Sequence, residues 1–168
     1  MAPASRQEAR LRQAVLSLAK DTEFGKRMIN GGRLSVPSVY DTPLSTPDGD
    51  SWRGGPRPGA SMPDAPLSGR DGNSTFLTEA FVRAGKKFAL LEFANGAATG
   101  VPDDVGVIRI GSDGFGDPSG LLNARYDAAP GTGYLLRPDG YVAARFRHPT
   151  RGAIDAALGR ATAVNRGL

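Results

Sequence analysis

Prolines crowd the segment between residues 33 and 72. Seven occur there, at positions 37, 43, 47, 56, 58, 63 and 66. Each removes a backbone donor and restricts the residue before it, so neither a helix nor a central strand can run through this segment. Apolar side chains recur along it, namely Leu34, Val36, Val39, Tyr40, Leu44 and Trp52. We therefore expect an extended arm that is pinned to another surface and connects two domains.

The residues before this arm predict a helix over 5–29. Its apolar positions follow the helical period, at Leu11, Val15 and Leu18. Ser5 and Glu8 have the spacing of a capping box, and Asn30-Gly31-Gly32 supplies the stop. An amphipathic helix cannot bury its own apolar stripe, so residues 1–32 are expected to need a partner surface.

Residues 73–168 have the pattern of a compact α/β domain. The expected elements are a helix over 74–84, strands over 88–93 and 105–110, a helix over 121–128, strands over 134–137 and 141–145, and a last helix after Thr150. Both FALLEF (88–93) and VGVIRI (105–110) are nearly continuous apolar runs, typical of strands buried on both faces. Residues 94–104 are compatible with a short helix or a loop.

Local capping and turn chemistry supports several of these boundaries. Pro138-Asp139-Gly140 fits the tight turn of a hairpin, because proline fixes φ and glycine accepts a positive φ. Ser74 and Thr150 are candidate N-caps of the helices that follow them.

The order helix, strand, strand, helix, hairpin, helix resembles the thioredoxin fold. We expect an α/β domain with a thioredoxin-like mixed sheet flanked by helices, preceded by the N-terminal helix and the Pro-rich arm. In that fold a proline, usually cis, precedes the hairpin, and Pro130 stands at this place. The Cys-x-x-Cys pair would fall within ANGAAT (94–99), but the chain has no cysteine, which excludes thiol–disulfide exchange.

Three motifs in order resemble the C-terminal region of FAD-dependent aromatic hydroxylases. They are Arg57-Pro58-Gly59-Ala60 with Pro63-Asp64-Ala65-Pro66-Leu67, the hairpin YLLRPDGYVAAR (134–145), and Asn30-Gly31-Gly32-Arg33-Leu34-Ser35-Val36-Pro37 with Pro43-Leu44-Ser45-Thr46-Pro47-Asp48. The last resembles the 3-(3-hydroxyphenyl)propionate hydroxylase and phenol hydroxylase branch. The resemblance implies that residues 1–32 end an FAD-binding part, that 33–72 are the arm, and that 73–168 form the thioredoxin-like domain.

Complete members of that family are monooxygenases that use FAD, NAD(P)H and O₂, and the flavin carries the chemistry. This chain has no G-x-G-x-x-G after a strand, and Gly114-x-Gly116 followed by Gly120 has the wrong spacing. We expect a non-catalytic domain with a structural, docking or dimerisation role, whose partners are the FAD-binding catalytic domain and a second copy. The alternatives are a subunit of an active split flavin hydroxylase and a basic protein-interaction module, so enzyme status stays open.

No residue is assigned a catalytic, cofactor-binding or metal-binding role. His148 is the one histidine, and its place before Pro149 is more typical of a junction than of a catalytic site. The aspartates that suggest a carboxylate site lack EF-hand spacing and favour turns and caps: Asp103, Asp104, Asp113 and Asp117. Three arginines could receive an anion, although a solvated helix entrance is the favoured interpretation: Arg145, Arg147 and Arg151. Trp52 is expected to anchor the arm, and Asn73-Ser74-Thr75 is a sequon without a secretory signal.

Charge and hydropathy argue against two classes of partner. The net charge is +4 and the pI is near 9.8, yet basic residues are scattered and are not interleaved with aromatic ones, so we expect no nucleic-acid binding. No run approaches the length of a membrane span, and no signal peptide is apparent. The expected location is the cytoplasm.

Overall fold

The computed structural model describes residues 38–85, 87–93 and 100–164, together with scattered positions between 5 and 22. The chain divides into two compact units, Met1–Val36 and Pro37–Leu168. In the first unit the helical described positions are Gln7, Arg10, Leu11, Gln13, Ala14 and Ser17. Ser5 and Thr22 are also described and are not helical. The other residues of the predicted helix over 5–29 and its stop at 30–32 lie outside the described residues, as does the segment 94–99.

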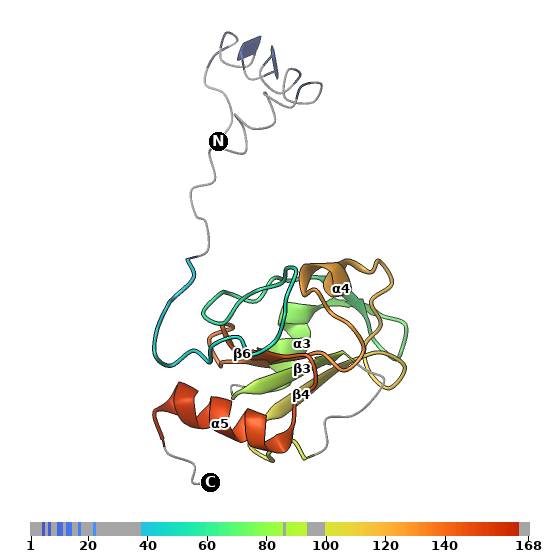
Figure 1. The fold of residues 1–168 in the computed structure, drawn as a ribbon. Coiled ribbons are helices and arrows are strands. Elements are labelled where there is room, and N and C mark those ends of the chain that lie inside the picture. The colour runs from blue at the N-terminus through green and yellow to red at the C-terminus, as the bar shows by residue number, and fades with distance from the viewer. Residues whose placement is uncertain are drawn as a thin grey trace. The chain divides into compact units, whose positions relative to one another are not determined.

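The second unit is built on a four-stranded mixed sheet (Figure 1). The strands are β3 (Ala89–Phe93), β4 (Gly106–Ile110), β5 (Gly133–Leu136) and β6 (Val142–Phe146). Their order is β4-β3-β5-β6, with β3 parallel to β4 and β5 antiparallel to both β3 and β6. This arrangement confirms the predicted α/β fold, a parallel pair followed by an antiparallel hairpin.

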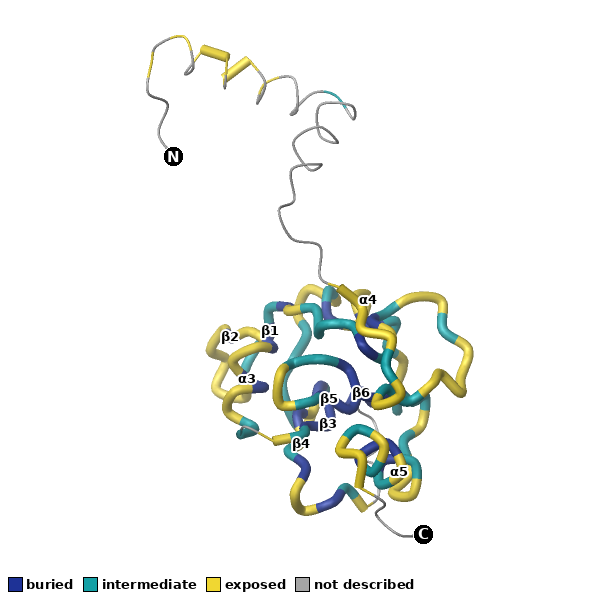
Figure 2. The backbone as a smooth tube through the Cα atoms, turned by 90° about the vertical axis from the view of Figure 1, so that its left-hand side faces the viewer, coloured by how far each residue is buried: buried dark blue, intermediate teal, exposed yellow. Residues whose placement is uncertain are grey.

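Helices cover both faces of this sheet (Figure 1). Successive strand residues point to opposite faces, so Leu91 packs in the cluster containing α3 (Leu77–Arg83) and α4 (Leu121–Arg125), whereas Leu90 packs in the cluster containing α5 (Arg151–Thr162). The resulting core is the dark centre of Figure 2. The sheet is therefore sandwiched between two apolar layers.

The two predicted buried strands differ in burial. All five residues of β3 are buried, which confirms the prediction for the first apolar run. The prediction is wrong for β4, where Val107 and Arg109 are exposed. β4 is an edge strand of the sheet, so one of its sides has no neighbouring sheet strand.

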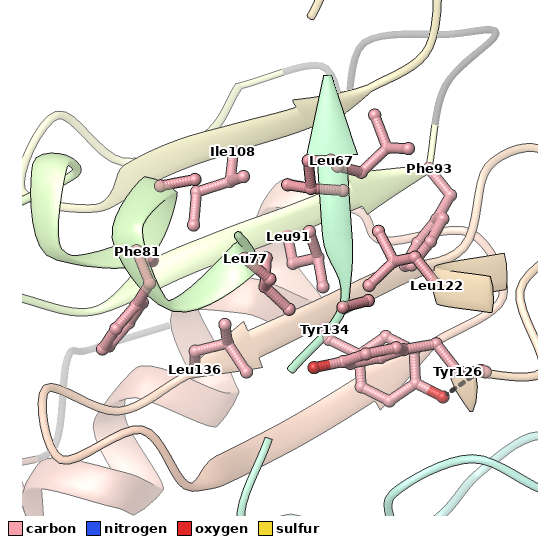
Figure 3. Close-up of a cluster of buried hydrophobic side chains, with 14 of the residues drawn as sticks. Leu67, Leu77, Phe81, Leu91, Phe93, Ile108, Leu122, Tyr126, Tyr134 and Leu136 are labelled. Atoms are coloured by element: carbon pink, nitrogen blue, oxygen red, sulfur yellow. Dashed lines mark hydrogen bonds between the residues drawn. The ribbon is translucent and has the colours of Figure 1, made fainter. Parts of the chain in front are cut away.

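Aromatic side chains fill the layer between the sheet and α4 (Figure 3). The rings of Tyr126 and Tyr134 meet edge to face, with centroids 4.9 Å apart. The Tyr134 hydroxyl donates to the Tyr126 carbonyl, and the Tyr126 hydroxyl donates to the Pro63 carbonyl at 2.9 Å. Each buried hydroxyl thus has an acceptor, which removes most of the cost of burying it.

The predicted helix over 74–84 begins three residues late. Residues Ser74–Phe76 form β2 and pair with β1 (Pro66–Ser68), and the helix α3 starts at Leu77. Ser74 is therefore not its N-cap. The Asp64 carboxylate accepts from the Thr78 amide at 3.0 Å, so a side chain from the arm satisfies the start of α3.

The predicted hairpin turn and last helix are both present. Gly140 has φ of 79°, and its amide donates to the Arg137 carbonyl at 2.9 Å. The Thr150 hydroxyl accepts from the Ala153 amide and caps α5, as predicted. Pro130 departs from the thioredoxin pattern, because no cis peptide bond occurs in the described part of the chain.

The arm lies on β6. The Thr46 amide donates to the Ala143 carbonyl at 2.9 Å, and Val142 exchanges hydrogen bonds with Gly59 and Ala60, at 2.8 and 2.9 Å. From Pro37 onward the arm falls in the same compact unit as the sheet, whereas the sequence analysis divides the two between residues 72 and 73. The described arm protects one edge of the sheet.

Candidate functional site

Two arginines at the end of the last strand hold the arm in place. Arg145 lies in β6, and Arg147 follows the end of that strand by one residue. Both guanidinium groups contact the ring of Trp52, so the two side chains lie on the same side. The Arg145 guanidinium contacts both oxygens of Asp48, with Nε–Oδ1 at 2.7 Å and Nη2–Oδ2 at 2.6 Å. It also donates to the carbonyls of Gly54 and Gly55. Such a bidentate pair fixes the arm in both distance and angle.

Arg147 makes a second set of contacts beside the first. Its guanidinium donates to the Asp127 carboxylate at 2.6 Å and to the Ser51 carbonyl at 3.1 Å. Its backbone amide donates to the Asp50 carboxylate at 2.9 Å. These contacts join the arm, β6 and the segment after α4.

Trp52 packs against both guanidinium groups. The Cζ atoms of Arg145 and Arg147 lie 4.4 and 3.7 Å from its ring centroid, and its ring meets Tyr134 edge to face. Cation–π contacts of this kind contribute about 0.5–2 kcal/mol each, depending on how far they are desolvated. We call Asp48, Trp52, Asp127, Arg145 and Arg147 the arm clamp.

The arm clamp corrects one interpretation of these arginines. Arg145 is buried, with only 7% of its side chain exposed, and the donors of Arg145 and Arg147 are directed at protein acceptors. They are therefore not a solvated helix entrance, and they are not free to receive an anion. Arg151 forms an exposed pair with Asp155 on α5 at 2.7 Å.

Tyr134 and Asp127 are among the ionisable groups at the arm clamp whose pKa values are shifted. Burial raises the pKa of the Tyr134 hydroxyl to about 12, so this group stays protonated and donates its hydrogen bond. The amide of Arg53 and the guanidinium of Arg147 lower the pKa of Asp127 below its usual value. Near neutral pH the uncharged Tyr134 hydroxyl thus lies beside the charged side chains of the arm clamp.

The other candidate residues are dispersed. His148 is exposed at the junction before α5 and lies close to Gly131, where an added Cβ would meet its Nδ1 at 2.6 Å. The Asp117 carboxylate accepts from the Asn123 amide at 2.9 Å and holds the start of α4. Asp103 and Asp113 contact Lys87 and Arg70 through their backbone carbonyls. Asp104 and the sequon Asn73-Ser74-Thr75 do not join the arm clamp.

The glycine-rich loop after β4 does not fit a dinucleotide. A Cβ at Gly114 would meet the Arg109 carbonyl oxygen at 2.0 Å, and one at Gly116 would meet the Ser68 hydroxyl at 2.4 Å. These glycines let the loop pack against β4 and β1, and no helix starts at either of them, so this loop lacks the form of a dinucleotide phosphate cradle.

The described residues hold neither a cluster of metal ligands nor a membrane-spanning helix. None of their His, Asp and Glu side chains gather in threes as a metal site requires. None of their helices has the length and apolar character to cross a membrane.

Asp48 and Asp127 were missed at the sequence level. Both lie far from their partners, 97 residues from Arg145 and 20 from Arg147. The one available signal was the two-residue spacing of Arg145 and Arg147, which places both side chains on one side of an extended segment. Without a partner in view, that spacing is equally typical of a solvated surface.

Solved flavoenzymes share this architecture, which is that of a thioredoxin-like domain. PieE, a flavin-dependent monooxygenase solved with FAD and substrate, matches 94% of this chain at 28% identity and a TM-score of 0.58. Aklavinone-11 hydroxylase, solved with FAD and aklavinone, matches 75% of it at 26% identity and a TM-score of 0.59. The chain spans 30% and 26% of those two chains.

Sequence comparison places the chain in a family. The model of the aromatic-ring hydroxylase C-terminal family matches residues 55–163, and the chain belongs to that family. No curated protein matches the chain. The matched region begins after Asp48 and Trp52, so two residues of the arm clamp precede it.

Proposed function

We propose that this chain is the non-catalytic C-terminal domain of an FAD-dependent aromatic-ring hydroxylase, with a structural or docking role. The observation that carries the proposal is the arm clamp within a domain of this family: its conspicuous polar side chains bind the protein's own arm. A domain built in this way holds the described part of the arm, from residue 38 onward, in a fixed relation to β6. It contributes rigidity, and the chemistry belongs to another part of the parent enzyme.

The parent enzyme is proposed to use FAD, NAD(P)H and O₂ on a phenolic substrate in the cytoplasm. PieE and aklavinone-11 hydroxylase, which were solved with FAD, support the cofactor. The motifs at 30–37 and 43–48 support the 3-(3-hydroxyphenyl)propionate and phenol hydroxylase branch. The FAD-binding part is the proposed partner of this domain.

A flavin titration tests the non-catalytic role. The chain is mixed with FAD, and both flavin fluorescence and the emission of Trp52, its one tryptophan, are followed. We expect no quenching of the flavin and no visible absorbance in the protein after gel filtration. Stoichiometric retention of FAD would refute the proposal and favour a subunit of a split flavin hydroxylase.

A homodimer is the proposed assembly of the isolated chain. Three large apolar side chains are exposed close together along the arm: Val39, Tyr40 and Leu44. Burying such side chains against a second copy removes apolar area from water. Light scattering at several concentrations is expected to give twice the chain mass, and a monomer throughout would refute the dimer.

A further inference from the structure

The outer edge of β4 has unpaired backbone groups. In a parallel pair the amide and carbonyl of one residue point to the same side, and successive residues alternate. The Gly106 amide donates to Phe88 on β3, whereas the Arg109 carbonyl accepts from Phe115 on the opposite side. Val107 and Arg109 therefore direct their backbone outward. The Val107 amide, the Val107 carbonyl and the Arg109 amide have no hydrogen-bond partner in the described part of the chain.

These three groups face a groove of about 460 Å³. The groove is lined by residues of β4, the β1–β2 turn, α3 and the loop at 113–115. At one end Phe115 already pairs with β4, through a parallel bridge to Ile110. At the other end Ala84 lies against Gly106, where a Cβ would meet the Ala84 carbonyl oxygen at 2.9 Å. The open stretch is therefore about two residues of strand long.

Hydrogen-bond donors exceed acceptors in this groove. Arg70, Arg83 and Arg109 line it, and each guanidinium carries five N–H donors. Arg109 is paired with Glu92 at 3.1 Å, but Arg70 contacts only a backbone carbonyl, and the carboxylate nearest to Arg83 is 3.9 Å away. Asp71 and Asp113 also line the groove; the Asp71 carboxylate accepts from the Asn73 amide at 3.1 Å and interacts electrostatically with Arg83. An occupant that supplies carboxylates would satisfy the spare donors of Arg70 and Arg83.

We propose that the β4 edge binds an extended acidic polypeptide segment from outside this chain, by strand addition. The segment pairs with Val107 and Arg109 through its backbone and places carboxylates on Arg70 and Arg83. A second copy of the chain fits poorly, because pairing two β4 edges about a twofold axis brings the arginines of one groove against those of the other. This inference does not depend on the FAD proposal. It explains why the chain covers the β6 edge with its own arm but leaves part of the β4 edge open.

Strand addition is tested on the full chain with the peptide acetyl-Glu-Val-Glu-Val-Glu-Val-amide as the probe. Amide hydrogen exchange is followed by NMR with and without the peptide. We expect exchange at the Val107 and Arg109 amides to slow at least about tenfold, because both amides gain an acceptor. Unchanged exchange at both amides under saturating peptide would overturn the proposal.

Two variants separate backbone pairing from charge. Val107→Pro removes an outward amide, a change that an edge strand tolerates, and it should abolish peptide binding while thermal unfolding stays close to that of the wild type. Arg83→Glu should weaken binding at least about tenfold. Arg151→Glu on α5 is the matched charge reversal on the other face of the sheet, and it should leave the affinity within about twofold.

Competing occupants give different results. A lysine version of the peptide that binds as tightly would overturn the acidic specificity. Inorganic phosphate that displaces the peptide and reproduces its spectral changes would indicate a small-anion site in place of strand addition. Protection of the two amides that grows with protein concentration, without peptide, would indicate a second copy and would also overturn the proposal.

Discussion

Replacing Arg145 with alanine should cost far more stability than the geometry of its ion pair alone suggests. Arg145–Asp48 and Arg151–Asp155 have almost the same N–O distance, 2.6 and 2.7 Å. They differ in burial: the arginine side chain is 7% exposed in the first pair and 54% in the second. Burial therefore decides the comparison.

The magnitude follows from what each substitution leaves behind. Breaking a buried pair costs about 3–5 kcal/mol when the remaining charge stays buried. Asp48 is 33% exposed, so water recovers part of that cost, while the loss of the contact with Trp52 adds about 1 kcal/mol. We expect Arg145→Ala to cost about 3 kcal/mol and to lower Tm by about 10 °C. Arg151→Ala removes an exposed pair and should cost less than about 0.5 kcal/mol.

Urea unfolding with two probes measures the effect and locates it. Emission of Trp52 reports on the arm clamp, and far-ultraviolet circular dichroism reports on the sheet and helices. In Arg145→Ala the fluorescence transition should precede the dichroism transition, because the arm is released first. A double-mutant cycle with Asp48→Ala should give a coupling of about 1–2 kcal/mol. Equal losses of stability in Arg145→Ala and Arg151→Ala would refute the argument from burial.

Further predictions concern titration, backbone and capping. The pKa of Asp127 in the folded protein is below the unfolded value of 3.8. Its contribution to folding stability is therefore present above pH 3.8 and is lost as the pH falls through the folded pKa. Asp127→Asn should remove this loss, so that Tm changes less with pH on the acid side of a Tm–pH profile. The pKa of Tyr134 in the folded protein is raised to about 12, above the unfolded value of 10.0. Its contribution to folding stability is therefore present below pH 10 and is lost as the pH rises through 12. In a pH titration of tyrosinate absorbance, Tyr134→Phe should remove the part of the change that occurs near pH 12. Gly59 and Gly140 both have a positive φ, 87° and 79°. An added Cβ at Gly59 would meet the Tyr40 carbonyl oxygen at 2.0 Å, whereas one at Gly140 would meet no atom within 4 Å. Chemical denaturation should therefore show that Gly59→Ala costs at least about 1 kcal/mol more stability than Gly140→Ala, and equal costs would contradict the clash. Thr150→Ala should cost about 1 kcal/mol by losing the N-cap of α5, and Thr150→Ser should restore most of it in thermal melts.

Local chemistry was sufficient to predict much of the fold. The turn at 138–140 and the cap at Thr150 depend on residues next to them in sequence, and both predictions are confirmed. The buried β3 was recognisable because a central strand is apolar on both faces. β4 has a similar composition, but its place at the edge of the sheet is a property of the topology, which the run itself does not encode.

Long-range partners account for what the sequence did not predict. The start of α3 is satisfied by Asp64, fourteen residues away, so no capping pattern at 74–77 indicates the true boundary. The arm was predicted to be pinned by apolar side chains, and Trp52 does pack on Tyr134. The arm is also held by the Asp48–Arg145 ion pair and by the hydrogen bonds of Arg147 to Ser51 and Asp50, which are identified only once the hairpin and the arm lie together.

The attachment of the arm to β6 also has a mechanical consequence. A pull on the chain ahead of residue 38 first loads the bond between Tyr40 and Gly59, and then reaches β6 through Thr46 and the Asp48–Arg145 pair. Detaching residues 38–62 from β6 would release a tether of about 80 Å. The arm clamp therefore resists the removal of the arm from β6 under load.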